Sequence, residues 1–213
     1  MRIEIIVDTI EGKYLCDVGC DHGYIPILAC KTKKIEKAIA MDVNKQPLEK
    51  AKENISKTNY KIDTQLSNGL EKYNGQCDTI TICGMGGLLI IKILENSLNK
   101  INYEQLILQP QSDFYLFRKF LINNSIKIEK EIYVKEKNKF YIIFSCRKNC
   151  EDIKYSEKEL YFGKNNSSAT YKSYLLHEIE KYKKIINKTT DNEKKLFCKK
   201  IIEYGINSIE SLG

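Results

Sequence analysis

Three features are scarce or missing in this sequence, and each absence excludes a class of protein. No apolar run approaches the ~20 residues that a membrane-spanning helix needs. The first residues, Met1 to Glu4, lack the uninterrupted apolar stretch of a secretory signal, so we expect a soluble, cytoplasmic chain with no membrane partner. Only three prolines, alongside eleven glycines, argue against a collagen-like or linker-dominated architecture.

Metal-binding cysteine pairs are missing as well. The eight cysteines include no C-x-x-C pair, and the spacing of a four-ligand zinc site is absent even though His22 lies close to Cys16 and Cys20. In a reducing compartment the thiols are expected to stay free, and free cysteines are commonly buried. We therefore expect no metal and no disulfide framework.

The sequence does contain enough apolar residues for a packed core. Its 213 residues are 42% hydrophobic and 30% charged, which fits one domain of ordinary size, alone or with a small appendage. The net charge of +7 is compatible with a nucleic-acid partner. The abundance of Lys, Asn and Ile is typical of codon bias, so the lysine excess is weaker evidence for a polyanion than the charge alone implies.

Residues 1–150 alternate apolar runs with amphipathic ones. Strands separated by helices of this length are typical of a doubly wound parallel sheet, an α/β fold. Two closing β segments, 126–134 and 140–147, are close enough to form an antiparallel hairpin at one edge. We predict strands at 13–18, 38–42, 62–66, 78–83 and 105–108, and helices at 25–30, 46–57, 88–98 and 114–122.

Residues 151–213 follow a different pattern. Apolar side chains recur every three or four positions over 167–188 and again from Glu193, and Asp191 in the polar break between them is suited to cap the second helix. Two helices joined by a short turn predict an antiparallel hairpin. The composition leaves two roles open for it, a packing or dimerising element and an arm that contacts RNA.

The most informative segment runs from Cys16 to Tyr24, between the first predicted strand and the first predicted helix. A turn of small residues at this place lets a ligand approach backbone N–H groups at the edge of the sheet. Asp21 replaces the middle glycine of a G-x-G-x-G turn, and a carboxylate repels a pyrophosphate but attracts a sulfonium. The implied ligand is S-adenosylmethionine rather than NAD or FAD, and its candidate contacts here are Asp17, Gly19, Cys20, Asp21 and Gly23.

Two further strand ends supply candidate cofactor contacts. Asp42, followed by Val43, ends the second strand 25 residues after Asp17, where an acid accepts hydrogen bonds from both ribose hydroxyls. Dehydrogenases and methyltransferases share this feature, so it does not separate them. Asn68, followed by Gly69, ends the third strand, and its amide oxygen can accept a hydrogen bond from an adenine amino group. The alternative is that Asn68 and Gly69 simply form a tight turn.

A second glycine-rich segment, residues 83–87, directly follows the fourth strand. In amino-methylating enzymes the loop at this place receives the acceptor base. Its glycines expose backbone groups to a planar ligand, and Met85 offers a polarizable contact. We assign Gly84 to the cofactor and Met85, Gly86 and Gly87 to the substrate; the alternative is a glycine-rich helix start.

Three motifs, taken in order, resemble those of the bacterial TrmK family. They are Asp17-Val18-Gly19-Cys20-Asp21-His22-Gly23-Tyr24-Ile25-Pro26, then Gly84-Met85-Gly86-Gly87, then Leu108-Gln109-Pro110-Gln111. That family comprises tRNA (adenine(22)-N1)-methyltransferases, and the resemblance covers the whole chain. It implies a Rossmann-like class I methyltransferase domain at 1–150 and a C-terminal antiparallel helical hairpin, similar to the family's coiled coil, at 151–213. It also implies S-adenosylmethionine as methyl donor, S-adenosylhomocysteine as product and tRNA as partner.

The resemblance implies methyl transfer to N1 of an adenine in the tRNA D-arm. N1 already carries a lone pair and the methylated base is cationic, so no proton need leave before attack, and catalysis can rest mainly on positioning. The candidate catalytic residues are Asp21 and His22. Asp21 can orient the donor, stabilise the developing cation or take an N6 proton, and His22 can titrate or buttress the loop.

The remaining candidate substrate contacts are Tyr24, Gln109 and Pro110. Tyr24 can stack on a base, and Gln109 can bond the adenine edge; the alternatives are packing for Tyr24 and capping the strand before Pro110 for Gln109. Two other functions stay open: a methyltransferase acting on a non-RNA substrate, and a non-catalytic RNA-binding protein with a vestigial cofactor pocket. We expect a monomer, with a dimer through the hairpin as the alternative.

Overall fold

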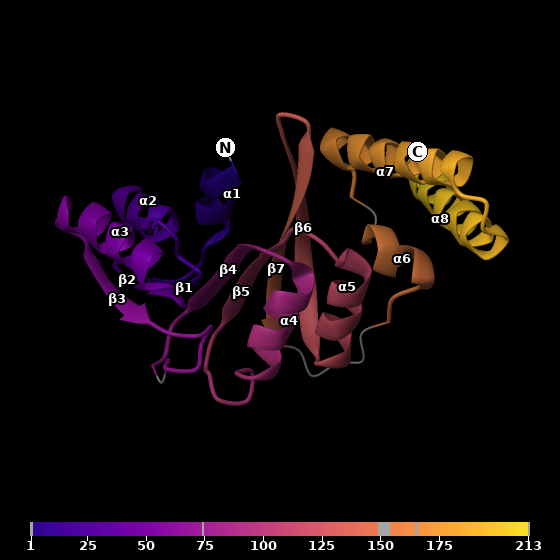
Figure 1. The fold of residues 1–213 in the computed structure, drawn as a ribbon. Helices are drawn as coiled ribbons and strands as arrows, with labels where there is room; N and C mark the ends of the chain where they lie inside the picture. The colour runs from indigo at the N-terminus through magenta and orange to yellow at the C-terminus, as the bar shows by residue number, and fades with distance from the viewer. Residues whose placement is uncertain (1, 74, 149–153, 165, 213) are drawn as a thin grey trace.

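The fold is built on a seven-stranded sheet in this computed structural model, which describes residues 2–73, 75–148, 154–164 and 166–212 (Figure 1). The strand order is β3-β2-β1-β4-β5-β7-β6. The first five strands pair in parallel, β7 is antiparallel to β5, and β6 is antiparallel to β7. The strands are β1 (Tyr14–Val18), β2 (Lys37–Asp42), β3 (Lys61–Leu66), β4 (Thr79–Met85), β5 (Gln105–Pro110), β6 (Ile126–Glu136) and β7 (Lys139–Lys148).

Helices cover both faces of the sheet, because successive residues of a strand point to opposite sides. On β1, Leu15 belongs to a core with α1, α2 and α3, and the next residue, Cys16, belongs to a core with α4 and α5. Figure 1 shows the first three helices together at the β1–β3 end of the sheet. These helices are α1 (Arg2–Thr9), α2 (Tyr24–Lys31), α3 (Lys45–Ser56), α4 (Gly87–Glu95) and α5 (Phe114–Asn123).

The predicted parallel sheet and its antiparallel edge hairpin are confirmed, and β7 and β6 form that hairpin. The helix predicted at 88–98 is shorter, since α4 ends at Glu95. Within the described residues, no helix is both long enough and apolar enough to cross a membrane.

One helix, α1 at the start of the chain, was not predicted from the sequence. In α1 the buried residues are Ile6 and Val7, and Ile10 after the helix is buried with them. Together with Ile3 these positions follow the i, i+3, i+4, i+7 spacing of an amphipathic helix, which was the signal available in the sequence. An eight-residue helix is marginal by itself, so α1 depends on burying this stripe against α2 and the sheet.

The chain ends in three further helices, α6 (Glu157–Phe162), α7 (Ala169–Lys188) and α8 (Asn192–Glu210). The helix α6 was also missed, although Ser156 and Glu159 form a complete capping box, whose S-x-x-E pattern is visible in the sequence. The predicted cap is confirmed, because Asp191 accepts hydrogen bonds from the backbone of Glu193 and Lys194 at the start of α8.

The α7–α8 hairpin lies beyond α5 and α6, away from the β3 edge of the sheet (Figure 1). Its buried residues Tyr171, Leu175 and Ile201 belong to the same hydrophobic core as Phe117 of α5 and Phe144 of β7. The boundary predicted between residues 150 and 151 lies outside the described residues. The core of the hairpin is therefore continuous with one face of the sheet.

A buried ion pair joins the sheet to α6. Arg118 of α5 is fully buried, and its Nε and Nη2 donate to the two carboxylate oxygens of Glu131 on β6 at 2.9 and 2.7 Å. Its Nη1 donates to the carbonyl oxygens of Leu160 and Tyr161, each at 3.1 Å. One guanidinium thus fixes the last turn of α6 against the sheet.

Candidate active site

A cavity of about 500 Å³ opens at the carboxyl ends of β1, β2 and β4. Parallel α/β sheets bind ligands at this edge, where neighbouring crossover connections leave on opposite faces. Of the residues assigned from the sequence, the lining contains Asp17, Gly19, Cys20, Asp21, Tyr24, Asp42, Val43, Asn68, Gly69, Gly84, Met85 and Gln109. The assigned residues outside the lining are His22, Gly23, Gly86, Gly87 and Pro110.

The turn after β1 is tightly wound. The amides of Gly19 and Cys20 both donate to the carbonyl oxygen of Met41, at 2.8 and 2.9 Å, which ties the turn to β2. Asp21 has a φ of 49°, in the left-handed region, which glycine adopts freely and aspartate tolerates better than most residues. The backbone therefore keeps the shape of a glycine turn while it carries a carboxylate at this position.

Asp17 provides a buried carboxylate at the floor of the cavity. It is 2% exposed, and its Oδ1 accepts a hydrogen bond of 2.6 Å from the Thr81 hydroxyl. Its Oδ2 is buried with no hydrogen-bond partner among the described residues. Burial raises the pKa of Asp17 to about 7; the Thr81 hydrogen bond opposes this increase, and the charge of Asp42 adds to it. A cation placed at Oδ2 would satisfy this group.

The raised pKa of Asp17 predicts a pH-dependent stability in the ligand-free protein. Because the folded state holds this proton more tightly than the unfolded chain, Asp17 favours folding most below its ordinary pKa of 3.8. That contribution is lost as the pH rises through about 7. Asp17→Asn keeps an acceptor for Thr81 and stays neutral. As the pH rises from about 4 to about 7, the free energy of unfolding of Asp17→Asn is expected to rise relative to that of the native protein, by up to about 4 kcal/mol.

Urea unfolding at several pH values measures this difference. Asp63→Asn is a suitable control, because Asp63 is exposed on β3 and lies outside the cavity lining. A difference between Asp17→Asn and the native protein that stays constant from pH ~4 to pH ~7 would contradict the prediction.

Asp42 lies at the end of β2 and holds two loops together. Its Oδ2 accepts a hydrogen bond from the Asp21 amide at 3.2 Å, and its Oδ1 accepts one from the Asn44 amide at 2.9 Å. Each carboxylate oxygen has two lone pairs, so each can accept one further hydrogen bond from the cavity side. The neighbouring Val43 is 57% exposed and offers an apolar surface beside it.

Asn68 and Gly69 follow β3 at the same edge. The Asn68 amide nitrogen donates to Glu71 at 2.6 Å, which fixes the amide and leaves its oxygen free to accept. Gly69 has a φ of 57°, and a Cβ there would lie 2.9 Å from Ile93. The segment is therefore a tight turn that also presents an acceptor to the cavity, so the two interpretations of this pair are compatible.

The end of β4 meets the loop after β1, because β4 extends through Gly84 and Met85, two residues beyond its predicted end. A Cβ added to Gly19 would lie 2.0 Å from the Met85 methyl carbon, so this loop and the end of β4 are in direct contact. Gly86 is the N-cap of α4 and Gly87 is its first residue, packed against the backbone of Ser112. The last two glycines of the motif thus serve the helix start, whereas Gly84 and Met85 face the cavity.

Three of the residues assigned to substrate binding or catalysis differ in how exposed they are: Gln109, Tyr24 and His22. Gln109 is fully buried, its amide nitrogen donates to the Pro110 carbonyl at 2.9 Å, and its Oε1 has no partner among the described residues. Tyr24 is 53% exposed and lines the cavity, with its ring 5.2 Å from that of His22. The His22 Nε2 lies 3.6 Å from the Asp21 carboxylate, just outside the lining.

Several cavity residues were not assigned from the sequence. The helix α1 contributes Arg2, Ile3 and Ile6, and other segments contribute residues such as Asn44 and Gln111. The helix α1 could have been found from its apolar spacing, but nothing local places it over the ends of β1 and β4. Among the described residues, no three His, Cys, Asp or Glu side chains are grouped so that they could hold a metal ion.

The sheet order with its antiparallel β7, and the glycine turn after β1 that carries the Asp21 carboxylate, define a Rossmann-like class I methyltransferase, which uses S-adenosylmethionine. A family model described as "TrmK: tRNA (adenine(22)-N(1))-methyltransferase" matches residues 15–210. The chain belongs to this TrmK family.

Three comparisons illustrate the similarity. The Bacillus subtilis (strain 168) tRNA (adenine(22)-N(1))-methyltransferase is 32% identical over 167 residues, which cover 76% of this chain and 70% of that protein. The structure of M. capricolum TrmK with S-adenosylhomocysteine is 30% identical with a TM-score of 0.89, covering 100% of this chain and 98% of that one. Streptococcus pneumoniae Sp1610 in complex with S-adenosyl-L-methionine is 31% identical with a TM-score of 0.88, covering 98% of both chains.

The residues present fit S-adenosylmethionine. The unpartnered Asp17 Oδ2 suits a cationic amino group, and Asp42 retains lone pairs for a pair of vicinal hydroxyls. The lining also carries Asp21, so three carboxylates face a space where a pyrophosphate would be repelled. This charge distribution suits a cofactor that is positive at sulfur and nitrogen.

Proposed function

We propose that this chain transfers the methyl group of S-adenosylmethionine to N1 of adenine 22 in the D-arm of tRNA. The observation that carries the proposal is the acidic cavity at the edge of the sheet, in which Asp17 keeps an unpartnered buried oxygen and Asp21 replaces a glycine. The family match supplies the acceptor, because it extends across both the sheet and the helical hairpin.

When bound, the cofactor supplies an electrophilic methyl group at its sulfonium. Asp17 and Asp42 then serve as anchors for its amino group and its ribose, and Asn68 as an acceptor for its adenine. The Gly19 turn and the Met85 side chain at the end of β4 touch each other and would border the bound donor. Rate enhancement comes mainly from holding donor and acceptor in line.

Asp21 is the proposed catalytic carboxylate. Its side chain is 67% exposed at the cavity edge, where an incoming base can reach it. Methylation at N1 makes the adenine cationic, so a nearby carboxylate stabilises the transition state more than the ground state. His22, 3.6 Å away, is proposed to orient this carboxylate.

The acceptor adenine is proposed to lie against Tyr24, Met85 and Gln109. The unpartnered Oε1 of Gln109 is an acceptor suited to the N6 amino group of the adenine. Tyr24 offers an exposed aromatic ring for stacking, and the Met85 thioether is polarizable. Gly86, Gly87 and Pro110 are proposed to act indirectly, by shaping the backbone at the ends of the strands that carry Met85 and Gln109.

We further propose that residues 1–150 carry the chemistry and that the hairpin within 151–213 contacts the tRNA. The outer surface of α8 carries two exposed apolar side chains, two lysines and two glutamates: Leu196, Phe197, Lys199, Lys200, Glu193 and Glu203. The aromatic ring and the two lysines are the groups of this face that can contact nucleic acid. A monomer is the proposed state, because α7 and α8 already bury Leu175 and Ile201 in the core that they share with the sheet. The proposed location is the cytoplasm, where tRNA is modified.

The proposed function predicts a strict dependence on the base at position 22. An unmodified tRNA transcript with adenosine there should incorporate labelled methyl from S-adenosylmethionine, and the same transcript with guanosine should not. Nucleoside mass mapping locates the product. Because lysine–phosphate contacts release counterions, kcat/KM for tRNA should also fall by at least tenfold between about 50 and 200 mM salt.

Other outcomes separate the alternatives. Equal labelling of both transcripts would mean that the assigned base is wrong. Binding of S-adenosylmethionine without labelling of either transcript would favour a non-RNA substrate. If calorimetry detects no binding of S-adenosylmethionine, the chain would be a non-catalytic protein with a vestigial pocket.

A further inference from the structure

A second cavity, of about 260 Å³, lies where the start of α5 meets the end of α6 and the middle of α7. Figure 1 shows α6 between α5 and the α7–α8 hairpin. Most of the lining is aromatic, and its rings are those of Phe114, Tyr115, Tyr161, Phe162, Tyr174 and Tyr182. Rings gathered around a cavity suit a flat ligand that stacks on them.

This aromatic cavity adjoins the proposed active site through the segment that follows β5. Gln111 lines the cofactor cavity and Asp113 lines the aromatic cavity, so Ser112 alone separates the two linings along the chain. The Cα atoms of Gln111 and Asp113 are therefore at most about 7 Å apart. The Ser112 hydroxyl donates to Asp113 at 2.6 Å and accepts from the Gly87 amide at 3.3 Å, which ties this segment to the start of α4. A polymer that reaches one cavity can thus reach the other.

The aromatic cavity also offers polar atoms to the edge of a planar ligand. The hydroxyl groups of three lining residues, Tyr161, Tyr174 and Tyr182, make no hydrogen bond within the part of the chain that the structure describes. Each can both donate and accept. The Glu178 carboxylate accepts from the Lys181 ammonium at 2.9 and 3.2 Å and keeps further lone pairs. The edges of nucleobases carry N–H donors and ring acceptors that match these groups.

The charges of the lining favour a neutral group over an anionic one. The lining contains two carboxylates, of Asp113 and Glu178, and one ammonium, of Lys181. A phosphate inside the cavity would therefore face a net negative charge, whereas a base would not be repelled.

Cations lie around the aromatic cluster rather than inside it. Tyr204 of α8 extends the cluster, with its ring centroid 6.2 Å from that of Tyr161. Exposed lysines of three helices lie 5.6–5.9 Å from the ring centroids of Tyr115, Tyr182 and Tyr204, and they are Lys119, Lys181 and Lys200. Rings for a base with cations nearby for its phosphates are the combination that binds unpaired nucleic acid.

We propose that the aromatic cavity binds a second, unstacked base of the tRNA while adenine 22 lies in the active site. This assignment rests on the proposed function, since it takes tRNA as the substrate. The adenine must leave its stack before N1 can reach a donor inside a cavity, and unstacking costs free energy. A nearby base that stacks on protein rings offsets part of this cost and fixes the register of the RNA. The shared segment between the two cavities favours RNA over a protein partner.

An abasic scan of the tRNA tests the proposal. Unmodified tRNAs, each lacking one base near adenine 22, are titrated with native protein and with Tyr182→Leu at one fixed salt concentration. Leucine stays apolar but removes the ring, so Tyr182→Leu should bind intact tRNA about fivefold more weakly or worse. One abasic position should weaken native binding by a similar factor and cause no further loss in Tyr182→Leu, because both changes remove the same contact.

A second variant and a conservative one support the scan. Leu116→Ala changes a lining residue that is 47% exposed, so it leaves the core untouched and should couple to the same abasic position. Tyr182→Phe keeps the ring and should bind tRNA more tightly than Tyr182→Leu. Every variant should bind S-adenosylmethionine as the native protein does, as measured by calorimetry.

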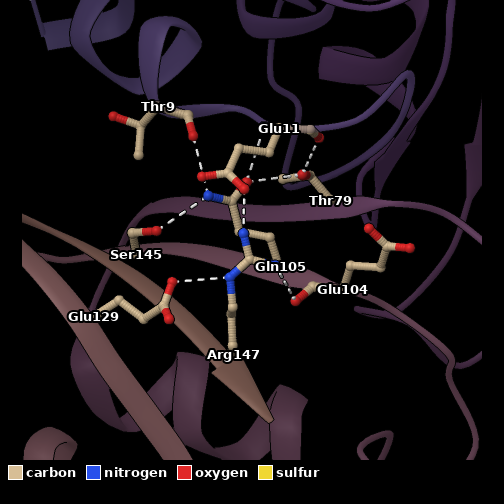
Figure 2. Close-up of polar contacts among 8 residues, drawn as sticks. All are labelled: Thr9, Glu11, Thr79, Glu104, Gln105, Glu129, Ser145 and Arg147. Atoms are coloured by element: carbon tan, nitrogen blue, oxygen red, sulfur yellow. Dashed lines mark hydrogen bonds and ion pairs between the residues drawn. The ribbon is translucent and has the colours of Figure 1, made fainter.

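A matched control lies at the opposite edge of the sheet. Tyr14 also has a lysine over its ring, with the Lys37 ammonium 4.2 Å from the centroid, but it lines neither cavity. It begins β1 at the edge where Thr79 and Gln105 begin β4 and β5 (Figure 2). Tyr14→Leu should leave the Kd of every tRNA in the set unchanged.

The outcomes separate this inference from the proposed function. If Tyr182→Leu and Leu116→Ala weaken all the tRNAs equally, or weaken none, no base occupies the cavity and the inference is wrong, while labelling at adenine 22 still supports the proposed function. A change of oligomeric state in Tyr182→Leu with unchanged tRNA affinity would overturn it too, and would assign the cavity to a protein contact. If the native protein labels no tRNA, the proposed function itself fails.

Discussion

Replacing Arg118 with methionine is expected to lower the free energy of unfolding by about 3–5 kcal/mol. The substitution leaves the Glu131 carboxylate, 7% exposed, with the Tyr133 hydroxyl as a donor but without its cationic partner. It also removes the donors for the carbonyl oxygens of Leu160 and Tyr161. An uncompensated buried charge costs far more than a lost surface contact. Urea unfolding at constant pH measures the difference.

Two further variants make this prediction specific. Arg147→Met removes an arginine that also pairs with two carboxylates, Glu11 and Glu129, but whose side chain is 33% exposed, so it should cost no more than about 1 kcal/mol. Adding Glu131→Leu to Arg118→Met removes the stranded charge and should recover part of the loss. If Arg118→Met costs no more than Arg147→Met, the buried pair does not stabilise the fold.

The contacts of Arg118 also determine how the role of the hairpin can be tested. Tyr171, Leu175 and Ile201 share a core with the sheet, and Arg118 donates into the last turn of α6. Truncating the chain before α6 would uncover this core and the buried ion pair together. A loss of tRNA methylation in such a truncation could then arise from unfolding alone, so substitutions on the exposed face of α8 test tRNA contact more directly.

The features that could be predicted from the sequence are those determined by residues close to one another in the chain. The strands were predictable because buried parallel strands are nearly continuous apolar runs, as in residues 105–108. The cofactor edge was predictable because Gly19 and Asp42 lie at strand ends that a parallel sheet must bring together. The Asp191 cap needs only its own side chain and the next turn of backbone.

The features that were missed depend on contacts between distant segments. Arg118 binds backbone carbonyls 42 and 43 residues away, and a carbonyl carries no sequence signal. Gln105 joins Thr9 and Glu11 across more than 90 residues, and this network decides where α1 lies. Arg2 therefore could not be assigned to the cavity from the sequence, although the helical pattern of α1 could have been recognised.

The second large effect is expected for Asp42, the proposed acceptor of the ribose hydroxyls. Asp42→Ala removes both oxygens proposed to accept the ribose hydroxyls, and it deprives the amides of Asp21 and Asn44 of their acceptor. Losing two such interactions corresponds to about 3 kcal/mol, so the Kd for S-adenosylmethionine is expected to rise by about 100-fold or more. Calorimetry without tRNA measures this directly. Asp63→Ala, an exposed acid on β3 outside the cavity, should leave the Kd unchanged.

A second ligand distinguishes a direct contact from a disordered loop. The native protein should bind 2′-deoxy S-adenosylhomocysteine about tenfold more weakly than S-adenosylhomocysteine, because one hydroxyl donor is missing. Asp42→Ala should lose this discrimination, since the acceptor for that hydroxyl is gone, even if its remaining affinity is low. If Asp42→Ala still prefers the hydroxylated ligand tenfold, Asp42 acts only by ordering the Asp21 turn. In that case the ribose must bind another acceptor, and the assignment of the strand end to the cofactor would be wrong at this residue.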